Sequence, residues 1–424
     1  MTDATQSGPM LAADGTPLKR SLARALRMQK IRALMLIAPL LLFILITFIL
    51  PIADMLFRSV ENQIVRDTLP KTVVALQDWD PASDEAPGEE VFLALAQDMK
   101  IAVEAKTHTR LGSRLNYEQT GAASLFRKSG RKVKRMDLEE DGPFREAFAD
   151  IDKKWIEPDI WRTIKTYSPA YTNGYFLNSI DMQKGPDGAE ARPENQQIYI
   201  KLFIRTMIMS LAITGSCILL GYPVAWLLAN LPMRQANLLM ILVLLPFWTS
   251  LLVRTSAWKV MLQQQGVIND TLVWLGLVDD ANRLIMINNQ FGTIIAMTHI
   301  LLPFMILPLY SVMQTIPPSY LRAAKSLGAD NWTAFWRVYF PQSVPGIGAG
   351  SILVFILAIG YYITPEIVGG TKGVFISNRI AYHISSSLNW GLAAALGTIL
   401  LAVVLLLYWC YDKIVGIDNV KLGG

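Results

Sequence analysis

The sequence predicts an all-α integral membrane protein with six transmembrane helices and a mostly helical domain outside the membrane. Of the 424 residues, 52% are hydrophobic and 17% are charged, whereas a soluble protein of this length carries about 25% charged residues. Six segments approach the roughly 20 apolar residues that cross a bilayer. A long polar stretch, residues 54–200, separates the first of these segments from the other five.

The predicted membrane spans follow one another along the chain at residues 33–52, 202–228, 238–258, 291–313, 346–368 and 390–411. The first span, within the segment 33–53, is not a cleavable signal, because its apolar run is too long and no small-residue cleavage site follows. The other five spans form a core over residues 201–413.

The distribution of Lys and Arg predicts the orientation of the chain. The N-terminal tail, residues 1–32, is basic, and an excess of Lys and Arg favours the cytoplasmic side. Counting spans from there places the loop at Arg234, the loop 314–345 and the C-terminal tail 414–424 in the cytoplasm. The short outer loops carry few basic residues, which agrees with this count.

Composition and residue spacing favour no catalytic or metal chemistry. The net charge of +5 is modest, and basic cytoplasmic loops explain it without nucleic acid. Cys217 and Cys410 each lie in an apolar segment, and His108, His299 and His383 are scattered. We therefore expect no disulfide framework, no metal site and no catalytic residue.

The glycine-rich segment 369–373 (GGTKG) lacks the spacing of a phosphate-binding loop. The predicted topology also places it outside the cell. We expect no cofactor in this chain, so the energy for any uphill movement would come from another chain.

The outer stretch predicts a small, mostly helical domain. Apolar residues recur at helical spacing over 89–104 and 144–156, whereas 80–88 and 183–193 have the composition of loops. Residues 107–135 are polar and basic, so disorder is an alternative there.

Small and helix-breaking residues inside the spans allow two interpretations. Prolines occur at Pro223, Pro246, Pro303 and Pro308. They predict either ordinary kinks or broken helices that line a pathway. The small residues Gly346, Gly348 and Gly350 favour close packing between helices.

Five polar or aromatic residues at membrane depth are candidates for a translocation pathway: Arg254, His299, Tyr361, Tyr362 and Glu366. For His299 the alternative is a neutral imidazole bonded to a neighbouring helix. The two tyrosines and the carboxylate suit an organic cation. An aromatic belt at the membrane interface explains the tyrosines equally well, and an interfacial position explains the charges.

The loop 314–345 is the most distinctive polar segment between two spans. Ser319 is a plausible N-cap for a first short helix, and Gly328 occupies the position of a left-handed C-terminal glycine. Asp330 or Asn331 can cap a second helix. We expect this loop to be a cytoplasmic handle that another protein binds.

Aromatic residues at helical spacing predict one apolar face on the second helix of this loop: Trp332, Phe335, Trp336 and Tyr339. Such a face can pack under the membrane domain. Pro341 and Pro345 are expected to end the helix.

The loop sequence RAAKSLGADNWTAFWRVYFPQSVPG resembles the "EAA loop" of bacterial binding-protein-dependent ABC importer permeases. The matching positions are Arg322, Ala323, Ala324, Gly328, Ala329, Phe335, Pro341 and Pro345. Lys325 lies among them. In that family the loop contacts the ATPase, and the motif begins with glutamate where this chain has Arg322.

Residues 246–270, 299–316 and 361–381 look like the B-type permease subunit of spermidine/putrescine importers and its polyamine, opine and phosphonate relatives. The resemblance covers the first span and nearly everything after Tyr199. The outer stretch is much longer than the corresponding loop and inherits nothing from the comparison.

The resemblance implies a type I ABC importer permease with six spans in the bacterial inner membrane, its two termini in the cytoplasm. Its partners would be a second permease, a cytoplasmic ATPase dimer and a periplasmic substrate-binding protein. The implied solute is a polyamine; an opine, an aminophosphonate, thiamine or an iron complex are alternatives. A membrane-anchored sensor is a different class of function, and an enzyme in the outer domain is a third.

Overall fold

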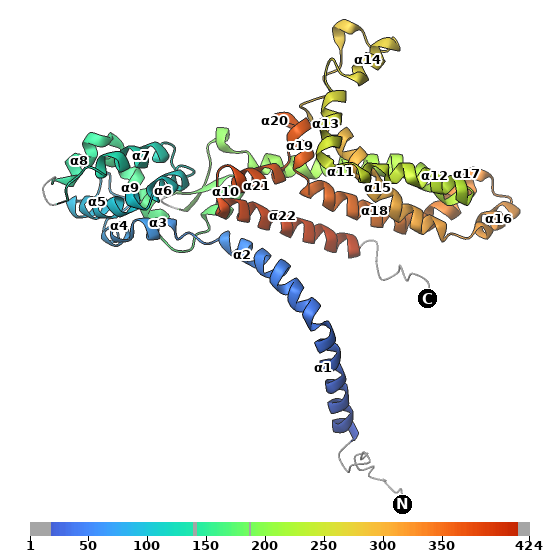
Figure 1. Cartoon of the computed structure of the whole chain (residues 1–424), viewed down its shortest axis with the longest axis horizontal. Helices are drawn as coiled ribbons and strands as arrows, with labels where there is room; N and C mark the ends of the chain where they lie inside the picture. The colour runs from blue at the N-terminus through green and yellow to red at the C-terminus, as the bar shows by residue number, and fades with distance from the viewer. Residues whose placement is uncertain (1–17, 139–141, 186–187, 414–424) are drawn as a thin grey trace, which may run out of the picture. The chain divides into compact units, whose positions relative to one another are not determined.

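The computed structural model describes residues 18–138, 142–185 and 188–413, which form two units, one up to Phe57 and one from Arg58 onward (Figure 1). The first unit is helical: α1 (Leu18–Ile44), a π-helical turn η1 (Leu45–Ile49) and α2 (Leu50–Arg58). Its apolar part, Leu26–Arg58, is long enough to cross a membrane. The tail 414–424 lies outside the described residues.

The outer domain is helical apart from one hairpin. Its elements are α3 (Ile64–Thr68), α4 (Pro70–Ala75), α5 (Glu89–Glu104), α6 (His108–Leu115), α7 (Ala122–Val133), α8 (Phe144–Ile151), η2 (Lys153–Trp155), α9 (Pro158–Thr166), α10 (Gly174–Ser179), β1 (Met182–Gly185), β2 (Gly188–Ala191) and η3 (Glu194–Gln196). Residues 107–135, where disorder was the alternative, are mainly helical. The expected loop at 183–193 is instead largely an antiparallel pair, because Met182 faces Ala191 and Gly185 faces Gly188 across it.

Aromatic side chains form the centre of the outer domain. Trp155, Trp161 and Phe148 are fully buried, and the Trp155 ring meets the Phe148 ring edge to face at 5.5 Å. The indole of Trp155 donates to the Ser129 hydroxyl at 2.9 Å, and that of Trp161 donates to the Trp155 carbonyl at 2.8 Å. The outer domain therefore has its own core with satisfied polar groups.

The membrane part contains α11 (Tyr199–Asn230), α12 (Met233–Leu244), η4 (Leu245–Trp248), α13 (Leu251–Met261), α14 (Val267–Trp274), η5 (Asp280–Asn282), α15 (Gln290–Gln314), α16 (Pro318–Ser326), α17 (Asn331–Ala334), η6 (Phe335–Tyr339), α18 (Phe340–Gly360), α19 (Ile363–Val368), α20 (Gly370–Gly373), α21 (Ile376–Ser385) and α22 (Trp390–Tyr411). In the described residues, five helices are long and apolar enough to span a membrane, and six if the bent pair α12–α13 counts as one.

The third span, predicted as one helix over 238–258, is broken. The segments on either side of the break meet at 96°. Pro246 lies in the 3₁₀ turn η4, and Ser250 starts α13 anew by accepting a hydrogen bond from Val253 N at 3.1 Å. A proline together with a new N-cap thus breaks the helix at Pro246 instead of only kinking it, and the role of the break in a pathway stays a prediction.

The fifth span differs from the predicted 346–368 at both ends. One helical run extends from Asn331 to Gly360 through the π-helical turn η6, and the chain breaks at Tyr361 and Tyr362 before α19 begins. The prediction that Pro341 and Pro345 end the loop helix is therefore wrong.

Local hydrogen bonds explain why the helix continues past these prolines. Phe340 N donates to Phe335 O, five residues back, and Pro341 then falls in the first turn of α18, where a missing N–H is tolerated. Side chains bond carbonyls nearby: Gln342 Nε2 donates to Val338 O at 2.8 Å and Ser343 Oγ to Phe340 O at 2.7 Å. Val338 O and Phe340 O are not the carbonyls that Pro341 and Pro345 leave without an N–H donor, so the place of Pro341 in the first turn of α18 explains the continuation at that proline.

The helices α11, α15 and α18 lie side by side around one buried apolar cluster (Figure 1). Close approach depends on glycine: a Cβ on Gly346 would lie 3.2 Å from Leu309 Cα, and one on Gly350 would lie 3.2 Å from Met305 O. The predicted small-residue packing of the fifth span is confirmed.

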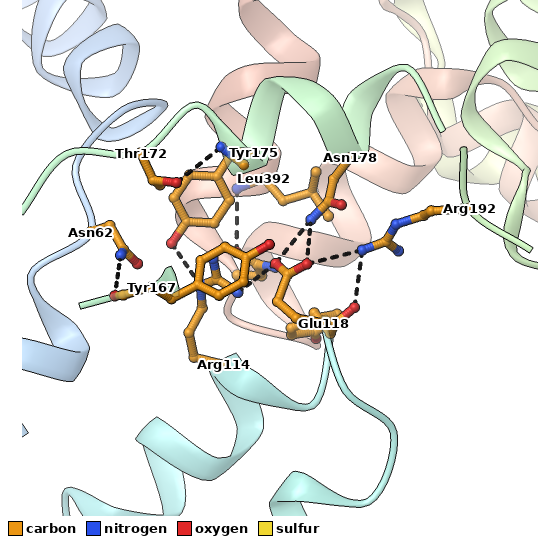
Figure 2. A network of polar contacts seen from close by, with 12 residues as sticks. Asn62, Arg114, Glu118, Tyr167, Thr172, Tyr175, Asn178, Arg192 and Leu392 are labelled. Atoms are coloured by element: carbon orange, nitrogen blue, oxygen red, sulfur yellow. Dashed lines mark hydrogen bonds and ion pairs between the residues drawn. The ribbon is translucent and has the colours of Figure 1, made fainter. Parts of the chain in front are cut away.

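A buried polar network lies at the base of the outer domain (Figure 2). Glu118 accepts hydrogen bonds from Arg114 Nη1 at 2.8 Å, Arg192 Nη2 at 3.2 Å and Asn178 Nδ2 at 3.0 Å. Arg114 Nε also donates to the Tyr175 hydroxyl at 2.9 Å. Because the Arg114 and Glu118 side chains are only 6% and 4% exposed, loss of one partner would leave a buried charge unpaired, at a cost of about 3–5 kcal/mol.

The same region joins the outer domain to the outer ends of the spans. The Tyr175 ring lies where a Cβ on Gly391 of α22 would be. The Tyr117 hydroxyl donates to Ser387 O at 3.4 Å. His383 of α21 bonds the Tyr199 hydroxyl through Nε2 at 2.9 Å and the Ser387 hydroxyl through Nδ1 at 2.8 Å.

This junction predicts a pH dependence of stability. Burial, with the nearby charge of Arg379, lowers the pKa of His383 to about 4, from about 6.5 for an exposed imidazole. Between these values the unfolded chain binds a proton that the folded chain does not, so stability falls as the pH decreases from about 6.5 to 4. Thermal unfolding midpoints of the solubilised protein across this range measure the slope.

His383→Gln should flatten this slope, while His108→Gln controls for removing an imidazole elsewhere in the outer domain. An unchanged slope in His383→Gln would contradict the conclusion that the lowered pKa of His383 causes the pH dependence.

Candidate functional site

The first helix of the loop 314–345 begins two residues earlier than expected. Pro317 is the N-cap of α16 and Pro318 its first residue. Ser319 therefore lies inside the first turn, and the prediction that it is the N-cap is wrong. The fixed φ of proline suits the first helical position, where no N–H partner is needed.

Gly328 forms the bend between the two loop helices. Its φ is +91°, and a Cβ there would meet nothing within 4 Å. The backbone conformation, not space, therefore requires glycine. Ala329 N donates to Ala324 O at 3.1 Å, and Asp330 Oδ1 accepts from Thr333 N at 3.2 Å. The predicted left-handed glycine is confirmed, and Asp330, not Asn331, is the second cap.

The four aromatic residues of the second helix do not share one packed face. Phe335 meets the Tyr222 ring of α11 edge to face at 6.1 Å, and Tyr339 is buried. Trp332 and Trp336 contact each other and remain 70% and 44% exposed. The π-helical turn begins only at Phe335, so it changes the spacing of the side chains after that residue, and Trp332 lies before it.

The outward surface of α16 is both basic and apolar. Arg322, Ala323 and Lys325 are exposed, and Leu327 is 89% exposed. An exposed leucine next to alanine permits close contact with a partner, and the cations favour acidic groups on that partner. Of the remaining predicted loop positions, Ala324 and Ala329 are half-buried.

Arg254 lies at the break in the third span. Its guanidinium donates from Nη2 to Pro246 O and, at 3.0 Å, to Thr249 O. These carbonyls belong to the turn where the helix is interrupted. Arg254 thus satisfies backbone groups freed by the break, a role suited to a charged side chain at membrane depth.

His299 of α15 faces the second half of the broken span. Trp258 Nε1 of α13 donates to His299 Nδ1 at 3.1 Å, so the imidazole accepts at Nδ1 and any single ring proton resides on Nε2. This contact matches the expectation of a histidine bonded to a neighbouring helix. Its role in a pathway stays a prediction.

The break after α18 is held by the start of α21. Ser377 Oγ donates to Tyr361 O at 2.7 Å. Asn378 Nδ2 donates to Tyr362 O at 2.8 Å and to Glu366 Oε2 at 2.6 Å. Glu366 and Tyr362 remain exposed at this break.

Sequence reasoning did not identify Asn378. The available signal was an asparagine three residues after Phe375, since Asn378 Oδ1 accepts from Phe375 N at 2.9 Å at the start of α21.

The two breaks lie next to each other. Thr255 of α13 and Thr364 of α19 share a hydrogen bond of 3.1 Å between their hydroxyls. Arg254 lies within electrostatic range of both His299 and Tyr361. The structure therefore brings the candidate pathway residues to two adjacent helix breaks beside α15. Within the described ranges, no three His, Cys, Asp or Glu side chains are placed to hold a metal ion.

Comparison with known proteins gives one family and several relatives. Residues 200–415 match the family described as the inner membrane component of binding-protein-dependent transport systems. The spermidine/putrescine transport system permease protein PotB of Escherichia coli (strain K12) is 37% identical over 215 residues, covering 50% of this chain and 78% of PotB. PotB of Haemophilus influenzae is 36% identical over 220 residues, covering 51% and 76%.

Among solved structures, a bacterial alginate ABC transporter in complex with an alginate-bound periplasmic protein is similar at 19% identity and a TM-score of 0.41. It covers 51% of this chain and 77% of that one. The outer domain, before residue 200, lies outside the family match.

The contacts of Arg254 predict a structural effect of its loss. Arg254→Met should lower the free energy of unfolding by about 1–3 kcal/mol, because Thr249 O loses the guanidinium donor and Pro246 O keeps only its bonds from Thr249. Thermal unfolding in detergent measures this. Lys259→Met is the matched control, since Lys259 is an exposed cation on the same helix. Equal unfolding temperatures for the two variants would refute the proposed role.

Proposed function

We propose a specific transport function from the premise that this chain belongs to the family of inner membrane components of binding-protein-dependent transport systems. It is a multi-pass permease subunit of an ABC importer. The solute that we propose is a polyamine such as spermidine or putrescine. The observation that carries this proposal is the 37% identity over 215 residues to permeases named for these two solutes.

The proposed assembly contains a second, similar permease, a cytoplasmic ATPase dimer and a periplasmic substrate-binding protein. Both termini of the chain are proposed to lie in the cytoplasm. ATP would be bound by the ATPase, and this chain would need no cofactor. The exposed α16 surface, with Arg322, Lys325 and Leu327, supports the loop as the ATPase contact.

The proposed coupling follows the chain from this loop into the membrane. α17 leads without interruption through η6 into α18, which packs closely on α15. A displacement at the loop would therefore reach Gly360, next to the break that carries Tyr361 and Tyr362. Helix breaks are places where segments reorient at small cost, because their backbone groups already bond to side chains.

The pathway residues proposed here are Arg254, His299, Tyr361, Tyr362 and Glu366. Glu366 and Tyr362 support a cationic solute, since an exposed carboxylate next to an aromatic ring suits an ammonium group. Arg254 is engaged by backbone carbonyls, and we propose that it maintains the break instead of contacting the solute.

Reconstitution tests the proposed solute. Proteoliposomes containing the permease pair and the ATPase, supplied with the binding protein and ATP, should accumulate labelled spermidine, and unlabelled putrescine should compete. If the proteoliposomes take up no polyamine but accumulate an opine, an aminophosphonate, thiamine or an iron complex, the proposed solute is wrong. The importer function would still hold.

Gly328→Val should abolish polyamine uptake with the protein still in the membrane. A β-branched residue in the left-handed conformation costs about 1–2 kcal/mol or more, so the bend between α16 and α17 would change. Gly397→Val is the control, because Gly397 is helical and a Cβ there meets nothing within 4 Å. Normal polyamine uptake by Gly328→Val would refute the proposed coupling between the loop and the membrane helices.

Arg322→Glu tests the charge at the ATPase contact. If Arg322 faces acidic groups, reversal should weaken binding of the purified ATPase by about 1 kcal/mol, or fivefold in Kd, as expected for an exposed ion pair. Titration of the labelled ATPase measures this. Arg234→Glu, an exposed cation in another cytoplasmic loop, should have no such effect. Tighter ATPase binding by Arg322→Glu would contradict this and show that the ATPase presents basic groups to this position.

A further inference from the structure

The outer domain carries a dense basic surface on α7 and the turn that follows it. Six exposed cations lie within nine residues and are here called the α7 basic face: Arg127, Lys128, Arg131, Lys132, Lys134 and Arg135. The opposite side of α7 is apolar, and Leu125, Phe126 and Val133 are buried in the core of the domain. Packing therefore fixes the direction in which the cations point.

Few of these charges are paired within the part of the chain that the structure describes. Lys128 pairs with Asp152 at 2.9 Å. The other five side chains have no hydrogen bond or ion pair with any part of the chain that the structure describes. Five of the six cations line a hollow of about 660 Å³, together with Asp150 and Ile151.

The fold itself does not account for this clustering. Cations in the last turn of a helix interact favourably with its dipole, which explains Arg131 and Lys132. However, Arg127 and Arg131, and likewise Lys128 and Lys132, are like charges four residues apart, an arrangement that destabilises a helix. A charged surface that opposes folding but is kept exposed indicates a partner of opposite charge.

The position of α7 within the outer domain favours a soluble partner. α7 packs against α5, α6 and α8 of the same domain, and α7 and α8 lie on the part of that domain away from α11 and α22 (Figure 1). α7 therefore lies apart from the ends of those two spans (Figure 1). A polycationic solute would be repelled by the α7 basic face.

We propose that the α7 basic face docks an acidic surface of the importer's soluble solute-binding protein. This inference rests on the proposed function, which supplies that partner. Tyr175 accepts a hydrogen bond from Arg114 of the buried network (Figure 2). Its ring packs closely on Gly391 and so joins the outer domain to α22. Docking on α7 would thus position the binding protein relative to the outer ends of the spans.

The test uses the complete importer in nanodiscs and its purified solute-binding protein. The variant Arg131→Glu/Lys132→Glu/Arg135→Glu should lower the association rate constant at low salt by about tenfold or more, because charges that steer encounter are reversed. At high salt the variant and the wild type should converge. Basal ATP hydrolysis should be unchanged.

The matched control reverses three exposed cations elsewhere on the outer domain: Arg66→Glu/Lys71→Glu/Lys184→Glu. It should associate like the wild type. A second variant, Lys134→Gln/Arg135→Gln, changes residues after the helix and keeps the test valid if the first variant misfolds. It should lower the association rate constant as well, but by less. Unfolding temperatures verify that each variant is folded.

Equal association rates for the wild type and the triple α7 variant would overturn the proposal, as would an equal loss in the control. A loss confined to binding of phosphatidylglycerol vesicles, with binding-protein association intact, would overturn it in favour of a lipid. If the wild-type importer takes up no polyamine, the proposed solute is refuted. That result is independent of the association rates, so a failure of the proposed solute can be told apart from a failure of the docking proposal.

Discussion

The uninterrupted helical run from Asn331 to Gly360 is the constraint on which the membrane part depends. It joins the loop 314–345 to the core without a flexible joint, although Pro341 and Pro345 lie within it. The π-helical turn at Phe335–Tyr339 makes this possible, because it changes the hydrogen-bond register just before the first proline. Close packing on α15 at Gly346 and Gly350 then links any movement of the run to the centre of the bundle.

Patterns that depend on local chemistry were predictable from the sequence. The left-handed Gly328 and the Asp330 cap follow from backbone preferences of single residues, and the spans follow from apolar length. The prediction that Pro341 ends the helix failed, because the π-helical turn places this proline in the first turn of α18, where no N–H partner is needed. The predicted aromatic face failed because only Phe335 and Tyr339 pack inward, whereas Trp332 and Trp336 remain exposed.

The helix breaks could be anticipated only in part. Pro246 was an ambiguous signal, and the contacts that resolve it come from distant or unexpected groups: Arg254 on the carbonyls, and Asn378 on Tyr362 and Glu366. The outer-domain network was not predictable either. Arg114, Glu118 and Arg192 look like ordinary surface charges in the sequence, and only the fold brings them together in a buried site. Buried ion pairs of this kind are costly to desolvate, so their role here is to fix one arrangement of the junction.

The central claim is that the run from the loop to Gly360 moves as one rigid lever. It is tested most directly by the distance between spin labels at Asn331→Cys and Gly360→Cys, in the assembled importer with Cys217 and Cys410 replaced. An α-helical rise predicts a separation of about 45 Å. The account predicts the same distance with and without ATP bound to the ATPase. A shorter or broader distance with ATP would show that the run bends at the π-helical turn and would contradict the lever.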